Sequence, residues 1–87
     1  MKEWRLYILI CKDDTLYTGI SKNVERRVTE HNNSKRGAKY TRHRRPVSLV
    51  YISKNMTKSL ACKEEYRIKR MTRLQKLNFL NHESNCL

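Results

Sequence analysis

The chain contains little that would interrupt regular structure or anchor it in a membrane. It has only two glycines and one proline, and no low-complexity tract or repeat, which excludes collagen-like and linker-like sequences. No apolar run approaches the ~20 residues that span a bilayer. Charged residues bracket the apolar segment near the N-terminus too closely for a signal peptide, so we expect neither a leader nor a membrane partner.

Cysteines are few, and their number is odd. Cys11, Cys62 and Cys86 show no metal-site spacing, and an odd count argues against a closed disulfide framework. We therefore expect reduced thiols in a cytoplasmic protein, with Cys11 and Cys62 mostly packing.

Negative charge is also scarce, because 8 Asp and Glu stand against 20 Lys and Arg, giving a net charge of +12. This excess predicts attraction to polyanions, with nucleic acid as the first candidate. An acidic membrane surface is less suitable, since the chain has no basic amphipathic helix with large apolar residues opposite.

What remains is typical of one small globular domain. The 87 residues are 38% hydrophobic and 32% charged, and a chain this short buries only about 60–65% of its unfolded surface. We assign residues 1–81 to a single domain and expect residues 82–87 to fray.

Three segments have the pattern of strands. Residues 4–11 are apolar on both faces, which indicates a central strand. The turn at residues 12–15 leads to a second strand at 16–20, where Gly19 suggests a bulge or the close approach of another backbone or a ligand. Residues 47–53 follow Pro46 and give the third strand.

The first helix follows Asn23, a plausible N-cap. At about 100° per residue, Val24, Arg27, Val28 and His31 share one core-facing arc. Arg27 therefore points toward the protein body, and the neighbouring arginine points to solvent. An unpaired buried guanidinium is costly, so Arg27 either has a partner or extends its charged end past the rim.

Residues 33–46 are predicted to form a loop without acidic residues. A charge run is usually a solvated surface, but the aromatic residue inside this one favours a loop that contacts phosphates. Its candidate contacts are Lys35, Arg36, Lys39, Tyr40, Arg42, Arg44 and Arg45.

A second helix is expected from Thr57 or Lys58 to Met71. Its apolar arc touches both Glu64 and Glu65, and periodicity does not choose between them. Residues 72–75 form a capping-box pattern that starts a third, short helix. In that helix Leu74, Leu77 and Leu80 are predicted to face the core.

Taken together, these patterns resemble the GIY-YIG nuclease superfamily, and within it the small stand-alone bacterial YhbQ-like group. The resemblance covers about residues 4–77. It lacks the glycine of the first half-motif and has threonine inside the second, as relatives in that group do. The matching segments are Leu6-Tyr7-Ile8-Leu9, Leu16-Tyr17-Thr18-Gly19-Ile20, Asn23-Val24-Glu25-Arg26-Arg27, Glu30-His31-Asn32, Gly37-Ala38-Lys39-Tyr40-Thr41-Arg42, Arg45-Pro46-Val47 and Glu65-Tyr66-Arg67-Ile68-Lys69-Arg70.

The resemblance implies an α+β fold, a three-stranded antiparallel sheet flanked by helices in the order β-β-α-β-α-α. It also implies metal-dependent hydrolysis of phosphodiester bonds in nucleic acid. We expect DNA, in preference to RNA, as the substrate, and a monomer that needs no small-molecule cofactor. The alternatives are a DNA- or RNA-binding module that keeps the fold but has lost catalytic turnover, and an RNA-binding partner protein.

The resemblance places the metal, Mg²⁺ or Mn²⁺, on Glu65, with Glu64 in reserve. Arg27 would neutralise the phosphate in the transition state. Tyr7 is then the expected general base and Tyr17 its orienting partner, while His31 is the alternative base.

Each of these residues has an ordinary structural interpretation as well. The two tyrosines could simply pack in the sheet, and His31 could be a hydrogen-bonded core residue. Glu65 could pair with Lys69, a further candidate nucleic-acid contact, one turn later. We prefer the catalytic interpretation because all five occur together at the family's spacing.

Overall fold

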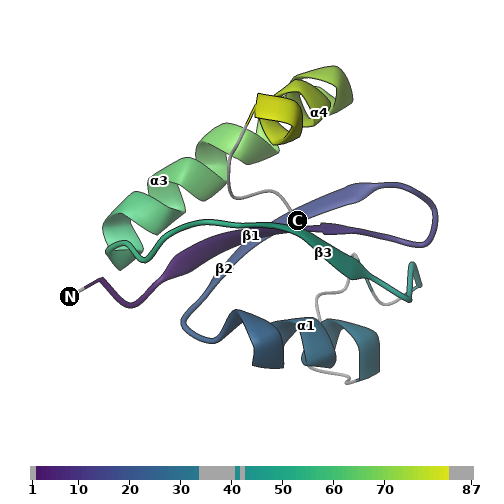
Figure 1. The fold of residues 1–87 in the computed structure, drawn as a ribbon, viewed down its shortest axis with the longest axis horizontal. Coiled ribbons are helices and arrows are strands. Elements are labelled where there is room, and N and C mark those ends of the chain that lie inside the picture. Colours follow the sequence, from purple (N-terminus) through teal and green to yellow (C-terminus); the bar gives the residue numbers. More distant parts are fainter. Residues whose placement is uncertain (1, 34–40, 42, 83–87) are drawn as a thin grey trace.

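The computed structural model describes residues 2–33, 41 and 43–82, and these form an antiparallel sheet with helices on both faces (Figure 1). The strand order is β2-β1-β3, so β1 is central, as its apolar faces predicted. The predicted α+β class is confirmed. The strands are β1 (Arg5–Ile10), β2 (Leu16–Ser21) and β3 (Ser48–Ile52).

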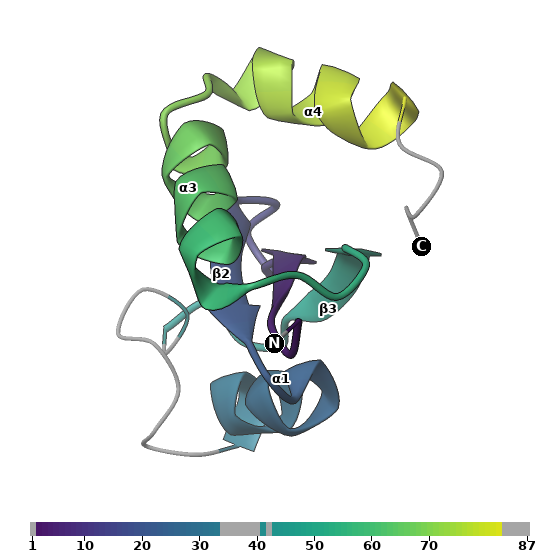
Figure 2. The same cartoon turned by 90° about the vertical axis from the view of Figure 1, so that its left-hand side faces the viewer.

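The helices cover opposite faces of this sheet. Helix α1 (Val24–Asn33) lies below it, and α3 (Lys58–Lys69) and α4 (Arg73–His82) lie above it (Figure 2). In the part of the chain that the structure describes, no helix is both long and apolar enough to cross a bilayer.

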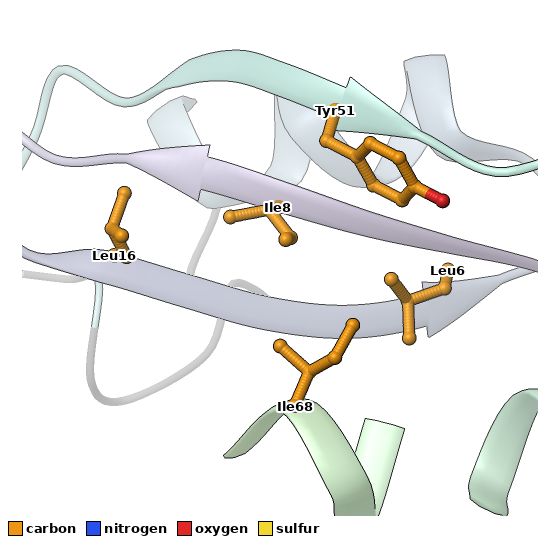
Figure 3. Packing of buried hydrophobic residues seen from close by; sticks show 5 residues of the cluster. All are labelled: Leu6, Ile8, Leu16, Tyr51 and Ile68. Carbon is orange, nitrogen blue, oxygen red and sulfur yellow. The ribbon is translucent and has the colours of Figure 1, made fainter. Parts of the chain in front are cut away.

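Alternate side chains of β1 pack into two separate hydrophobic cores, one on each face of the sheet. On the face covered by α3, Leu6 and Ile8 pack against Ile68 of that helix (Figure 3). On the lower face Tyr7 and Leu9 pack against α1 through Val24. Burying one large apolar side chain contributes about 1.5–3 kcal/mol, so both faces of β1 are needed to hold the helices.

Helix starts follow the sequence signals closely. Asn23 Oδ1 accepts from the amide of Arg26 at 3.0 Å, which confirms the N-cap of α1. Thr57 Oγ1 accepts from the amide of Leu60 at the start of α3. Ahead of α4, the amides of Thr72 and Gln75 donate to each other's side chains at 2.9 and 3.2 Å, the predicted capping box.

Two packing predictions are wrong. Leu74 is 68% exposed and Leu77 36% exposed, because α4 meets the core only near its C-terminal end. There Phe79 packs on Tyr51 with ring centroids 5.2 Å apart, and Leu80 joins the same cluster. On α3, Cys62 is exposed rather than packed.

Gly19 makes room for an aromatic ring on the central strand. It pairs with Tyr7 across β1 and β2, and a Cβ atom at this position would lie 2.5 Å from the Tyr7 hydroxyl oxygen. The group that approaches Gly19 is therefore a side chain, the Tyr7 ring, and not the backbone or ligand expected from the sequence.

Gly19→Ala is expected to lower the free energy of unfolding by about 1–3 kcal/mol, because the methyl group overlaps the ring. Denaturant unfolding measures this. In a Tyr7→Leu background the same substitution should cost much less, since the overlapping atoms are gone. An equal cost in both backgrounds would show that the ring is not the cause.

Candidate active site

Two of the residues predicted from the sequence, Tyr7 and His31, belong to a buried chain of hydrogen bonds. The Tyr7 hydroxyl lies 2.9 Å from His31 Nε2, and His31 Nδ1 lies 2.8 Å from Thr41 Oγ1. All three residues are at most 1% exposed. The imidazole is thus held at both nitrogens, by a strand on one side and by the segment after α1 on the other.

Tyr17 brings the edge strand to this chain. Its ring meets the His31 ring edge-on with centroids 5.0 Å apart, and it lies 6.4 Å from the Tyr7 ring. Unlike Tyr7, Tyr17 is partly exposed. The two phenols therefore differ in depth, with Tyr17 at the surface and Tyr7 beneath it.

The adjacent arginines of α1 have different environments, as the helical phase predicted. The Arg26 side chain is 74% exposed and the Arg27 side chain 29%. Arg27 has a partner, because its Nη1 donates to Glu30 Oε1 at 3.0 Å. Its charge also reaches Tyr7 and lowers that hydroxyl's pKa, although burial outweighs it.

The structure separates the two glutamates that periodicity could not. Glu64 pairs with Arg67 and helps line a hollow under α4 with Phe79. Glu65 lies on the other side of α3, where its charge acts on Tyr7. Its Oε2 lies 3.3 Å from Lys69 Nζ, so the ordinary ion pair is formed as well.

Burial governs the protonation of the inner pair. It raises the pKa of Tyr7 well above the ordinary value of a phenol, and the neighbouring Tyr17 adds to this. Burial also lowers the pKa of His31 to about 4, with the Arg27 charge contributing. Near neutral pH both groups are uncharged, and one hydrogen bond joins them.

The basic loop is described only in part. Lys35, Arg36, Lys39, Tyr40 and Arg42 lie outside the described residues.

The two described arginines of this loop hold it to the fold. Arg44 pairs with Asp13 of the β1–β2 turn at 3.0 Å. Arg45 donates to the backbone carbonyls of Glu30 and His31 at the end of α1. Their contact with nucleic acid stays a prediction.

Two contributors were not singled out from the sequence. Glu30 forms an ion pair with Arg27, and Thr41 Oγ1 is hydrogen-bonded to His31 Nδ1. Both lie inside the motif segments already quoted. The i+3 spacing of Glu30 from Arg27 is the signal that could have identified the first.

Comparison with known proteins identifies the family of this chain. The family model described as the GIY-YIG catalytic domain matches residues 3–78. This chain belongs to the GIY-YIG family.

Similar members of the GIY-YIG family are small bacterial proteins. UPF0213 protein SERP0126 of Staphylococcus epidermidis is 56% identical over 75 residues, which are 86% of this chain and 90% of that one. UPF0213 protein SSP2268 of Staphylococcus saprophyticus is 49% identical over 81 residues, which are 93% and 98% of the two chains. The solution structure of protein EF2693 from E. faecalis is 43% identical, with a TM-score of 0.63 over 93% of this chain and 88% of that one.

Acid should destabilise this GIY-YIG domain through His31. The imidazole pKa is about 4 in the fold and about 6.5 unfolded, so the unfolded chain binds the proton more tightly. The His31 contribution to stability is complete above about pH 6.5 and falls toward pH 4, by up to about 3 kcal/mol.

Urea unfolding between about pH 4 and 7 checks this expectation. His31→Gln should show a flatter pH profile than the wild type, whereas the exposed His43 serves as the control in His43→Gln and should leave the profile unchanged. Parallel profiles for wild type and His31→Gln would contradict the assignment.

Proposed function

We propose that this domain is an endonuclease of the GIY-YIG type, which hydrolyses phosphodiester bonds in nucleic acid and prefers DNA to RNA. The observation that carries the proposal is the meeting of five groups at the outer edge of β2. The buried pair Tyr7 and His31 lies beneath Tyr17, with Arg27 coming from α1 below and Glu65 from α3 above.

The donor set suits one hydrated divalent cation. Within the described residues, no group of three or more His, Cys, Asp or Glu side chains could hold a metal. Mg²⁺ binds through one or two carboxylates and keeps several waters, so Glu65 alone is sufficient protein ligation. Its pairing with Lys69 is partly exposed, and pairs of that kind are weak enough for a cation to displace.

When bound at Glu65, Mg²⁺ or Mn²⁺ would polarise the phosphoryl oxygen and lower the pKa of bound water. Arg27 would stabilise the negative charge that develops on the opposite side. A guanidinium has five N–H donors in a planar fork, so its bond to Glu30 orients the group and is compatible with donation to a phosphate.

The inner pair supplies a route for the proton of the attacking water. In this scheme Tyr7 takes that proton while its own passes along the 2.9 Å contact to His31 Nε2. Because its pKa is about 4, the His31 imidazole is neutral near neutral pH and Nε2 can take the proton, and the same low pKa favours return of that proton to Tyr7 once the water has attacked. Tyr17, at the surface, would hold the water and the phosphate against this pair.

The first test compares two neighbouring carboxylates. Loss of a group that only supports a metal ligand typically lowers activity about 10–100-fold. Glu65→Gln removes the ligand itself, so it should lower Mg²⁺-dependent cleavage of a labelled DNA by more than this. Glu64→Gln is the matched control, because it removes the same charge one residue away, on the Arg67 side. Equal activities of the two variants would contradict the proposal, and binding without cleavage by the wild type would favour a non-catalytic module.

The second test compares two neighbouring arginines. Arg27→Gln should lower kcat by about 100- to 1000-fold, as expected when one preorganised donor to a transition-state charge is lost. Arg26→Gln removes the same charge from the exposed side of α1 and should change mainly KM, by a small factor. Single-turnover kinetics on a flap and a nicked duplex separate chemistry from binding.

A further inference from the structure

A basic hollow adjoins the candidate active site on its α4 side. It has a volume of about 400 Å³ and lies between the outer part of β2 and the two upper helices. Tyr17 is shared with the candidate active site, which makes the two continuous. The lining residues are Leu16, Tyr17, Thr18, Lys69 and Lys76.

The hollow contains a lysine, Lys76, whose positive charge is not balanced by a nearby carboxylate in the described part of the chain. Lys76 is half-buried, and its pKa is lowered by burial and then by the Lys69 charge. Among the described residues, no carboxylate pairs with Lys76. It also occupies the first turn of α4, where the helix dipole disfavours a cation. Three costs therefore fall on one ammonium group.

Thr18 provides an independent sign of a missing ligand. This side chain is 2% exposed, and its Oγ1 has no hydrogen-bond partner within the described residues. An unsatisfied buried hydroxyl is rare and destabilising. Thr18 also lines the hollow, and a change of χ1 rotamer moves Oγ1 by about 120° around the Cα–Cβ bond without moving the backbone.

A smaller hollow extends the same basic path. It has a volume of about 190 Å³ and shares Leu16 and Lys76 with the first, and Arg73 lines it as well. Arg73 Nη1 donates to the backbone carbonyl of Asp14 at 2.5 Å, which fixes the guanidinium beside the β1–β2 turn. The two hollows therefore form one continuous path that is lined by Lys69, Lys76 and Arg73.

We propose that Lys76, with Lys69 and the Thr18 hydroxyl, binds a backbone phosphate of the nucleic acid next to the one that is cleaved. The inference rests on the proposed function for the nature of the ligand. It assigns the substrate path to the α4 side of the molecule, in addition to the basic loop after α1. A phosphate here would accept from the Thr18 hydroxyl and pair with Lys76, and it would give Lys69 a second anionic partner beside Glu65.

The first test is binding of a fluorescein-labelled DNA duplex of about 20 base pairs by fluorescence anisotropy, in EDTA so that no cleavage occurs. Lys76→Gln should weaken Kd about fivefold or more, and it should lower the slope of log Kd against log salt by about one. Lys76→Arg should restore binding. Lys63→Gln is the matched control, because it removes one exposed charge from α3 away from the hollow, and it should change Kd less than about twofold.

Thr18→Val gives a second readout that a purely structural role would not produce. The change is nearly isosteric, so the variant should melt at a higher temperature than the wild type, while its Kd rises about twofold to fivefold. A higher melting temperature with an unchanged Kd would remove Thr18 from the proposed site.

Neutralising single phosphates identifies the contact. Methylphosphonates replace single phosphates near the cleavage position, one at a time. At one position the replacement should raise the Kd of the wild type but leave the Kd of Lys76→Gln unchanged. The same cost in both proteins would overturn the assignment.

The outcomes separate this inference from the proposed function. If the wild type cleaves DNA and depends on Glu65, but Lys76→Gln and Lys63→Gln bind equally, the inference alone fails. If binding depends on Lys76 but no cleavage occurs, the nuclease fails and the phosphate site stands. A wild type that neither binds nor cleaves overturns both.

Discussion

The hydrogen bond between Tyr7 and His31 is the interaction on which the rest of the candidate site depends. It joins the central strand to α1 through two side chains that are at most 1% exposed, so a partner lost here would leave a buried polar group unsatisfied. Three other features serve it: Gly19 leaves space for the phenol, Thr41 fixes the second ring nitrogen, and Tyr17 packs on the imidazole. Arg27 lies on the same helix as His31, one turn before it.

Features set by local geometry were predictable from the sequence. The inward direction of Arg27 and His31 follows from about 100° per residue along α1, and the caps at Asn23 and Thr72 follow from side chains that reach amides two or three residues away. Glu65 could not be chosen over Glu64 in this way, because both border the apolar arc of α3. Only the placement of α3 over the edge of β2 decides which of them acts on Tyr7.

Depth was the other quantity that spacing could not supply. Leu74 and Leu77 have helical periodicity yet are exposed, since α4 touches the core only through Phe79 and Leu80. The candidate site shows the same limit, because Tyr7 is buried while Tyr17, from the neighbouring strand, reaches the surface. Depth depends on how two layers pack, and no single segment of sequence contains that information.

The position of β2 at the edge of the sheet has one more consequence. An unpaired strand edge can accept a strand from another molecule, and proteins commonly protect such edges with lysines. Lys69 and Lys76 flank β2 beside Tyr17, and paired strands lie only about 4.8 Å apart. Two copies meeting at this edge would force like charges together, so the cations that suit a polyanion also act against aggregation through the sheet.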